Sequence, residues 1–240
     1  MLVDAGATCR KLVQSLEAHG LSAEAVQGIC ITHTHTDHIK GLRVFLNQHP
    51  VPVYGTAETL AQLRALDKFP QSTDLREILP AETIHTDTAA VTAFATMHDA
   101  PGSCGYRFEL SDGQTCAVCT DLGCVTPEVK KGVYGADLVL LEANYDPNML
   151  RNGPYPEMLQ ERIRGKYGHL SNGDSAGMAE ALIAHGTTRL ILGHLSENNN
   201  TMPLAQQTVL EHLQEQGMRR NQDFLLQVSS PEGLKQAVIF

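Results

Sequence analysis

The sequence predicts a mixed α/β fold of the α+β kind, in which two β-sheets pack together and helices cover their outer faces. Segments with helical periodicity alternate with short apolar segments, and residues 75–118 read as a run of short strands. A chain of 240 residues that is 42% hydrophobic can bury a full core. No internal repeat or low-complexity linker divides it, so we expect one domain over residues 1–240.

The first third of the chain has clear helix and strand signals. A helix is expected after the N-cap Thr8, ending at Gly20, and another after Thr56. Residues 26–32 are apolar and β-branched and predict a buried strand, and residues 51–54 predict a short one. The chain itself begins with the end of a strand and a tight turn.

The rest of the chain continues the alternation. Strands 106–110 and 114–119 are expected to form a hairpin around a Ser-Asp-Gly turn. Residues 146–168 are expected to be irregular, apart from a short basic helix through residue 166. The other expected strands are 137–141, 188–192, 224–228 and 236–240. The other expected helices start at 126 or span 172–186 and 203–217.

A dense group of histidines follows the strand at 26–32. His33, His35, Asp37 and His38 fall within six residues, and imidazole and carboxylate are ligands that zinc and similar divalent metals accept. His33 and His35 point the same way in extended chain, while Asp37 and His38 come from the next bend and can face a second metal. The alternative is a solvated histidine-rich loop, but a flanking buried strand and amphipathic helix disfavour it.

Four further polar residues share one structural place, at the end of an apolar strand or just before a helix. They are His98, Asp121, His169 and His194. Strand ends converge on one rim of a layered fold, where binding sites are commonly built. We therefore expect these four side chains to lie beside the histidine motif.

The motif His-x-His-x-Asp-His, with His98, Asp121 and a late histidine, resembles the metallo-β-lactamase superfamily. Within it the likeness is to the YycJ/WalJ group of bacterial exonuclease-like proteins. The segments that carry the likeness are 3–6, 32–41, 98–100, 120–123, 142–146, 153–156, 168–172 and 193–196. The resemblance implies a four-layer αββα sandwich with two metals at the sheet edge. The family's usual first strands are missing from this chain, which would leave one sheet edge uncovered.

The resemblance also implies a ligand set for two divalent metal ions, zinc first, with manganese or iron as alternatives. His33, His35 and His98 would hold the first metal, Asp37, His38 and His194 the second, and Asp121 would bridge them. His169 is similar to a histidine of RNase Z-type nucleases that lies near the scissile phosphate.

The mechanism that follows is a hypothesis about phosphoryl chemistry. A hydroxide bridging two metals attacks phosphorus in line, Asp37 orients it, and His169 donates a proton to the leaving oxygen or binds the phosphate. Glu142 and Asn144 are expected as partners of the ligand histidines. Asn144 and Ser171 are also candidate substrate-binding residues, although Ser171 could instead cap the following helix.

Composition limits the remaining interpretations. Six cysteines in a chain of this length do not predict a disulfide scaffold and favour a reduced, cytoplasmic protein. Cys116 and Cys119 form a CxxC inside an apolar strand and are expected in the core, rather than on a structural zinc. The net charge of −9 argues against a broad basic surface for nucleic acid, but not against a substrate held at a metal cleft. The basic run 162–166 either leads a nucleic-acid backbone to the metals or is a solvated helix face.

We therefore predict a dinuclear metal-dependent hydrolase, a phosphodiesterase or exonuclease acting on DNA, with no membrane segment and no obligate protein partner. The alternative is a hydrolase of small esters, thioesters or lactones with the same dimetal site. The Gly-His-Leu-Ser-Asn context of His169 favours the nuclease. A non-catalytic regulatory module that keeps the fold is a third reading, and the complete ligand set argues against it.

Overall fold

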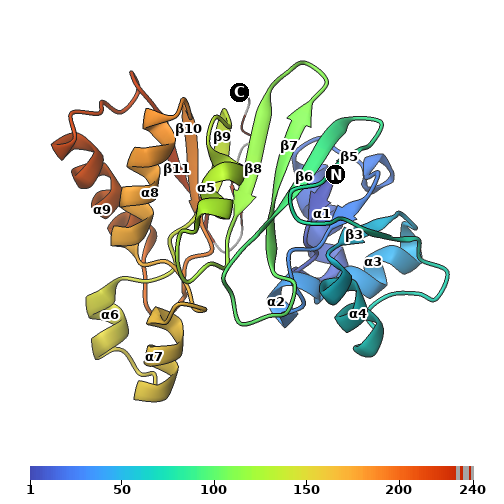
Figure 1. The fold of residues 1–240 in the computed structure, drawn as a ribbon. Helices are drawn as coiled ribbons and strands as arrows, with labels where there is room; N and C mark the ends of the chain where they lie inside the picture. The colour runs from blue at the N-terminus through green and yellow to red at the C-terminus, as the bar shows by residue number, and fades with distance from the viewer. Residues whose placement is uncertain (231–232, 235–237, 239–240) are drawn as a thin grey trace.

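The computed structural model describes residues 1–230, 233–234 and 238, so the last expected strand, 236–240, falls largely outside the described residues. Two β-sheets face one another, and helices cover the outer face of each (Figure 1). This confirms the αββα sandwich.

The smaller sheet has four parallel strands in chain order. They are β1 (Leu2–Val3), β2 (Ile29–Cys30), β3 (Val53–Gly55) and β4 (Leu75–Glu77). Helices α1 (Cys9–Ala18), α3 (Leu42–Gln48) and α4 (Ala57–Ala65) belong to this half of the molecule. Their apolar residues, such as Leu42, Phe45 and Leu63, pack with Ile29 and Val53 of the sheet in one buried cluster.

The larger sheet has seven strands, in the order β11-β10-β9-β8-β7-β6-β5. Its antiparallel part comprises β5 (Thr83–His85), β6 (Ala89–Ala95), β7 (Cys104–Leu110) and β8 (Thr115–Cys119). Its parallel part continues through β9 (Leu138–Glu142), β10 (Arg189–Gly193) and β11 (Leu225–Val228). The outer helices are α5 (Pro127–Val133), α8 (Asn172–Ala184) and α9 (Met202–Glu215). The predicted hairpin is confirmed as β7 and β8.

Apolar side chains from both sheets form the layer between them. Ile78 and Tyr54 come from the smaller-sheet half, and Val91 and Tyr106 come from the larger sheet. Tyr106 is fully buried, and its hydroxyl donates to the carbonyl of Ile31 at 2.7 Å. Because a buried hydroxyl without a partner would be costly, this bond helps to fix how the two sheets sit against each other.

Some element boundaries differ from the prediction for local reasons. The strand expected at 26–32 is reduced to β2, Ile29–Cys30, and is preceded by a 3₁₀ helix at Ala23–Ala25. The segment expected to be irregular contains α6 (Pro147–Asn152). Its signal was present in the sequence, since Asp146 caps the helix and a proline follows in its first turn.

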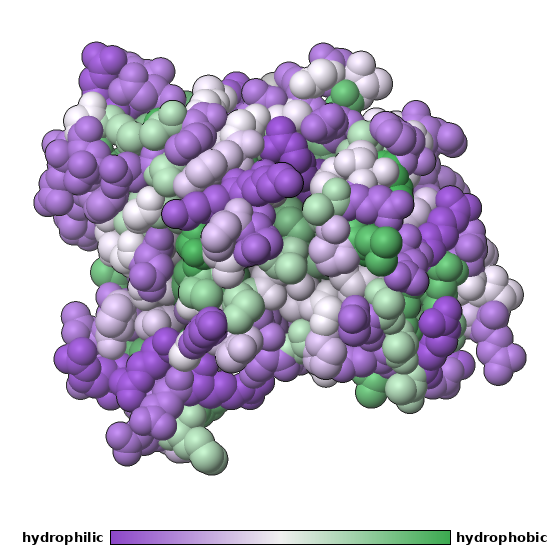
Figure 2. All heavy atoms as spheres, in the orientation of Figure 1, coloured by the Kyte–Doolittle hydropathy of each residue, from purple (hydrophilic) through white to green (hydrophobic). Residues whose placement is uncertain are grey.

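The polar end of the molecule lies where several strands finish. Helix α2 (Thr36–Ile39), α6 and α7 (Glu157–Arg164) lie at this end, at the bottom of Figure 1. Hydrophilic side chains gather there over the α6–α7 region, at the lower left of Figure 2. In the part of the chain that the structure describes, no helix is both long and apolar enough to cross a membrane.

Candidate metal centre

All seven predicted ligands come together at this end, and we call them the ligand cluster: His33, His35, Asp37, His38, His98, Asp121 and His194. They reach it from both sheets. The first four follow β2 and enter α2, while the other three follow β6, β8 and β10. The strand ends therefore converge as the sequence led us to expect.

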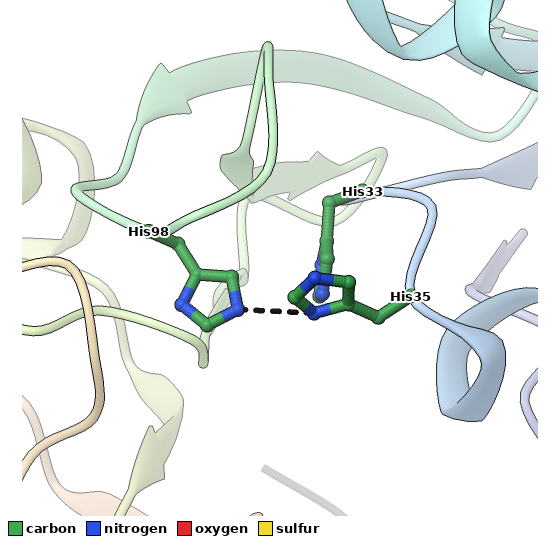
Figure 3. Close-up of side chains that lie close together, drawn as sticks. All are labelled: His33, His35 and His98. Atoms are coloured by element: carbon green, nitrogen blue, oxygen red, sulfur yellow. Dashed lines mark hydrogen bonds between the residues drawn. The ribbon is translucent and has the colours of Figure 1, made fainter. Parts of the chain in front are cut away.

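Three histidines form one group of donors. The ligand atoms of His33, His35 and His98 lie within 4.8 Å of one another. The rings of His35 and His98 meet edge-on, with His35 Nδ1 at 3.2 Å from His98 Nε2 (Figure 3). Nε2 of His33 is buried and has no hydrogen-bond partner. An unpaired buried nitrogen is costly unless something binds it, and three imidazoles suit a divalent metal.

A second group lies beside the first. The donor atoms of Asp37, His38 and His194 also lie within 4.8 Å of one another. Asp121 stands between the groups: one of its carboxylate oxygens is 3.6 Å from Nε2 of His98, and the other is 3.4 Å from Nε2 of His38. Oδ2 of Asp121 is buried and has no hydrogen-bond partner. The donors present fit two metals with Asp121 reaching both.

A shared hydrogen-bond pattern orients the imidazoles. In each of these histidines except His35, a neighbouring group makes a hydrogen bond to Nδ1, so Nε2 points away from that group. The partners are Thr32 for His33 (3.0 Å), Asp4 for His38 (2.7 Å), the Gly168 carbonyl for His98 (3.1 Å) and Glu142 for His169 and His194 (2.8 Å each). A histidine that donates Nδ1–H presents the Nε2 lone pair, which is the form that binds a metal.

Glu142, expected from the sequence as a partner of the ligand histidines, is fully buried at the end of β9. Besides the hydrogen bonds from His169 and His194, it accepts hydrogen bonds from the backbone N–H groups of Leu122 and Leu170, each at 3.1 Å. Burial alone would raise the pKa of this carboxyl, but the bonds from His169 and His194 outweigh it and hold the pKa well below its usual range. Glu142 is therefore a buried, negatively charged carboxylate that holds its neighbours by hydrogen bonds.

The electrostatics of the cluster favour a bound cation. Burial, together with the neighbouring imidazoles, holds the pKa of His33 well below its ordinary value, so its ring is neutral at pH 7. At His194, burial acts to lower the pKa, but Asp121, Asp37 and Glu142 outweigh it and raise the pKa well above the ordinary value. The carboxylates thus stabilise positive charge at this place, which a metal ion would supply.

Three residues of the site adopt left-handed backbone conformations. The φ angles of Asp4, Asp121 and His194 are 60°, 58° and 55°. Asp4 and His194 directly follow a strand, and Asp121 comes two residues after β8. Such angles are uncommon outside glycine and cost about 1–3 kcal/mol when they must be held. The sharp turn aims each side chain across the end of its sheet.

A cavity of about 720 Å³ opens over the cluster. Asn144 and His169 line it together with ligand residues, and the Nδ2 of Asn144 donates to the carbonyl of His194 at 2.8 Å. Ser171 is not among the residues that line the cavity; it caps α8 and exchanges hydrogen bonds with Asp174. The capping alternative therefore describes the contacts of Ser171, and its assignment to substrate binding stays a prediction.

Sequence reasoning gave no role to two carboxylates at the site. Asp4 holds His38, and Asp99 lies 3.4 Å from Nε2 of His98 and 3.5 Å from Nε2 of His35. Asp99 also pairs with Arg162 of α7. Its position directly after His98 was the available signal, whereas the contact of Asp4 across 34 residues had no local signature.

The basic run at 162–166 divides in the structure. Arg162 lines the cavity. Arg164 pairs with Glu161 at 3.7 Å, and Lys166, which lies beyond the end of α7, stands over the ring of Tyr167. Only the first of these residues therefore faces the site.

The six cysteines are free, and the two of the CxxC belong to β8, where Cys119 is fully buried. Within residues 1–230, 233–234 and 238, no cluster of potential metal donors includes a cysteine. The five histidines expected to be unrelated to the site, His19, His49, His85, His185 and His212, are also outside these clusters.

Comparisons with known proteins agree with this geometry. The family model described as "Beta-lactamase superfamily domain" matches residues 1–195. Exodeoxyribonuclease YycJ of Bacillus anthracis is 32% identical over 97% of this chain and 88% of its own length. Exodeoxyribonuclease WalJ of Streptococcus pneumoniae serotype 2, strain D39, is 32% identical over 97% of this chain and 87% of its own.

The fold is also similar to that of solved structures. Zn²⁺-bound PqqB from Methylobacterium extorquens superposes with a TM-score of 0.69 at 19% identity, covering 97% of this chain and 81% of that protein. The family model, the whole-length relatives and the donor cluster lead to one conclusion: the chain belongs to the beta-lactamase superfamily and is a metal-dependent hydrolase.

Proposed function

We propose that the protein is a DNA exonuclease, a phosphodiesterase that works with two divalent metal ions, zinc first. The whole-length likeness to two exodeoxyribonucleases supports a nucleic-acid substrate. In this proposal His33, His35 and His98 would hold one metal, Asp37, His38 and His194 would hold the other, and Asp121 could serve either.

The observation that carries the proposal is the position of His169. Its Nδ1 is engaged by Glu142, so its Nε2 is left for another partner, and the ring lines the cavity. Asp121, Glu142, His169 and His194 form a further group of possible donors. Within it, Glu142 is already engaged by hydrogen bonds of 2.8 Å from the rings of His169 and His194. His169 is therefore an imidazole beside the ligand cluster that is available to substrate.

The residues of the chain divide the work on a phosphodiester. Bound metals would supply an activated water and offset charge on the phosphate oxygens. Asp37, whose side chain is 69% exposed, faces the cavity and orients the attacking group. His169 binds the phosphate or donates a proton to the leaving oxygen, and Glu142 keeps its ring in place.

The test is degradation of end-labelled duplex and single-stranded DNA with zinc or manganese, beside a His169→Ala variant of unchanged metal content. We expect the wild type to shorten DNA from its ends and the variant to lose about 10²–10⁴-fold in rate. Cleavage of a thioester or lactone without cleavage of DNA or RNA would replace this function by the small-ester hydrolase.

We further propose that the protein works in the cytoplasm. The six free cysteines support a reducing compartment.

A further inference from the structure

Helix α7 presents an unusual wall to the cavity. It has no buried residue, yet Leu159, Arg162 and Ile163 all line the cavity, and so does Tyr155 just before the helix. The spacing of three and four residues places the helical side chains on one face. That face meets the cavity that holds the ligand cluster, so its apolar groups are available to a ligand.

Arg162 is the cation on this wall. Among the described residues that line the cavity, it is the one lysine or arginine. Its Nε donates to Asp99, which itself lies against His35 and His98. This contact uses Nε and leaves the two Nη groups for another acceptor, and a guanidinium matches phosphate oxygens well.

Tyr155 supplies an aromatic surface beside Arg162. Its hydroxyl accepts a hydrogen bond from Nδ2 of Asn198 at 2.9 Å, which ties the ring to the loop after β10. Asn198 lines the same cavity. A ring held in this way, with Leu159 and Ile163 nearby, suits the face of a nucleobase.

We propose that Tyr155, Leu159, Arg162 and Ile163 form a nucleotide subsite that holds the terminal nucleotide of the DNA strand. In this subsite Arg162 binds a phosphate, and Tyr155 with the two aliphatic side chains packs against the base. The inference rests on the proposed nuclease function and deepens it. A cavity of about 720 Å³ has the size of a small-ligand pocket, which favours a frayed end over an intact duplex.

The charges around the subsite make a further demand. Four carboxylates also line the cavity and would repel a phosphate: Asp37, Asp99, Asp121 and Glu197. Arg162 is the one lysine or arginine among the described residues that line the cavity, so metals bound at the ligand cluster would supply much of the charge that offsets them. Binding of a nucleotide to this subsite therefore depends on bound metal.

The experiment measures binding to the full-length, metal-loaded protein by calorimetry. The probes are deoxyadenosine 5′-monophosphate and deoxyribose 5-phosphate, which lacks the base. We expect the base to strengthen binding by between about 5- and 150-fold. Tyr155→Ala should remove this difference while binding of deoxyribose 5-phosphate stays, and Tyr155→Phe, which keeps the ring but loses the bond to Asn198, should keep most of it. Arg162→Gln should weaken both probes by about tenfold.

Two matched controls lie on the same segment and off the cavity. Tyr167→Ala removes an aromatic ring that is 53% exposed, and Arg164→Gln removes the arginine paired with Glu161. Both should bind the probes as the wild type does.

The subsite is overturned if neither probe binds, or if Tyr155→Ala keeps the full preference for the base. DNA degradation by the same preparations separates this result from the fate of the proposed function. If the wild type degrades DNA but Tyr155→Ala keeps its base preference, only the subsite proposal fails. If the wild type shows the predicted binding but degrades no DNA, the subsite proposal stands and the exonuclease proposal fails.

Discussion

Glu142 concentrates four hydrogen bonds on one fully buried carboxylate. Two come from the rings of His169 and His194, and two come from backbone N–H groups. A glutamine there would turn an NH₂ towards donors that already need an acceptor. We expect Glu142→Gln to weaken metal affinity and nuclease activity by about 10–100-fold each.

A matched pair on the surface provides the control. Glu180 accepts from His212 at 2.7 Å; it is partly exposed and does not line the cavity. Glu180→Gln should leave metal titration and activity unchanged. If Glu142→Gln and Glu180→Gln behave alike, Glu142 does not position the histidines.

Asp4 holds one ring of the second group. It accepts from Nδ1 of His38 at 2.7 Å and from the backbone N–H and hydroxyl of Thr32, each at 2.8 Å. Asp4→Asn removes the charge that keeps His38 in position. We expect affinity for the second metal to fall by about 10–100-fold while the first stays bound. Metal analysis should then find close to one ion per chain after dialysis, and two would contradict the prediction.

At the scale of elements, the turn after β1 is packed directly against α2. A Cβ on Gly6 would lie 1.6 Å from the carbonyl oxygen of Asp37, an approach that only a backbone shift could relieve. Gly6→Ala should therefore destabilise the fold by about 1–3 kcal/mol and lower metal content as the motif moves. Thermal unfolding followed by circular dichroism, with metal analysis, measures both.

Gly177→Ala is the comparison for that substitution. Gly177 is inside α8, and a Cβ there would meet nothing within 4 Å. Alanine favours a helix over glycine, so this variant should gain about 0.5–1 kcal/mol. A Gly6→Ala variant as stable as the wild type would show that the turn and α2 adjust freely.

Elements with local signals were predictable from the sequence. Thr8 and Thr56 accept the hydrogen bonds expected of N-caps, and the turn between β7 and β8 follows its Ser-Asp-Gly sequence. Helix α6 was missed because the breaker at 153–156 outweighed the cap at Asp146, although both signals act locally.

The site divides in the same way. His33 to His38 are contiguous and could be found by spacing, whereas His98, Asp121 and His194 were placed by resemblance and by their strand ends. Which carboxylate supports which ring could not be predicted, because the Asp4–His38 and Glu142–His194 contacts join residues 34 and 52 apart. The pairing of neighbouring strands, β1 with β2 and β9 with β10, brings such pairs together.

At the scale of the whole molecule, the single domain stays a prediction, and unfolding tests it. Each sheet has its own outer helices, but both share the apolar layer that contains Tyr106 and Ile78. We expect one cooperative thermal transition by calorimetry, with and without metal. Two resolved transitions would divide the chain into separately folding units.

Removal of metal should lower the melting temperature. Each ion present at a hundredfold excess over its dissociation constant adds about 2.7 kcal/mol to the free energy of unfolding. For a chain of this size, a chelator should then lower Tm by about 5–10 °C for each ion lost. Readdition of zinc should restore it, and an unchanged Tm would mean that the cluster holds no ion in the folded protein.

The order of the donors along the chain has a consequence for biosynthesis. In the proposed assignment, the first trio is complete once His98 has left the ribosome, whereas the second waits for His194 at the end of β10. A nascent chain could therefore bind its first metal before its second, and the second group of donors is complete only after β9 and β10 have been synthesised.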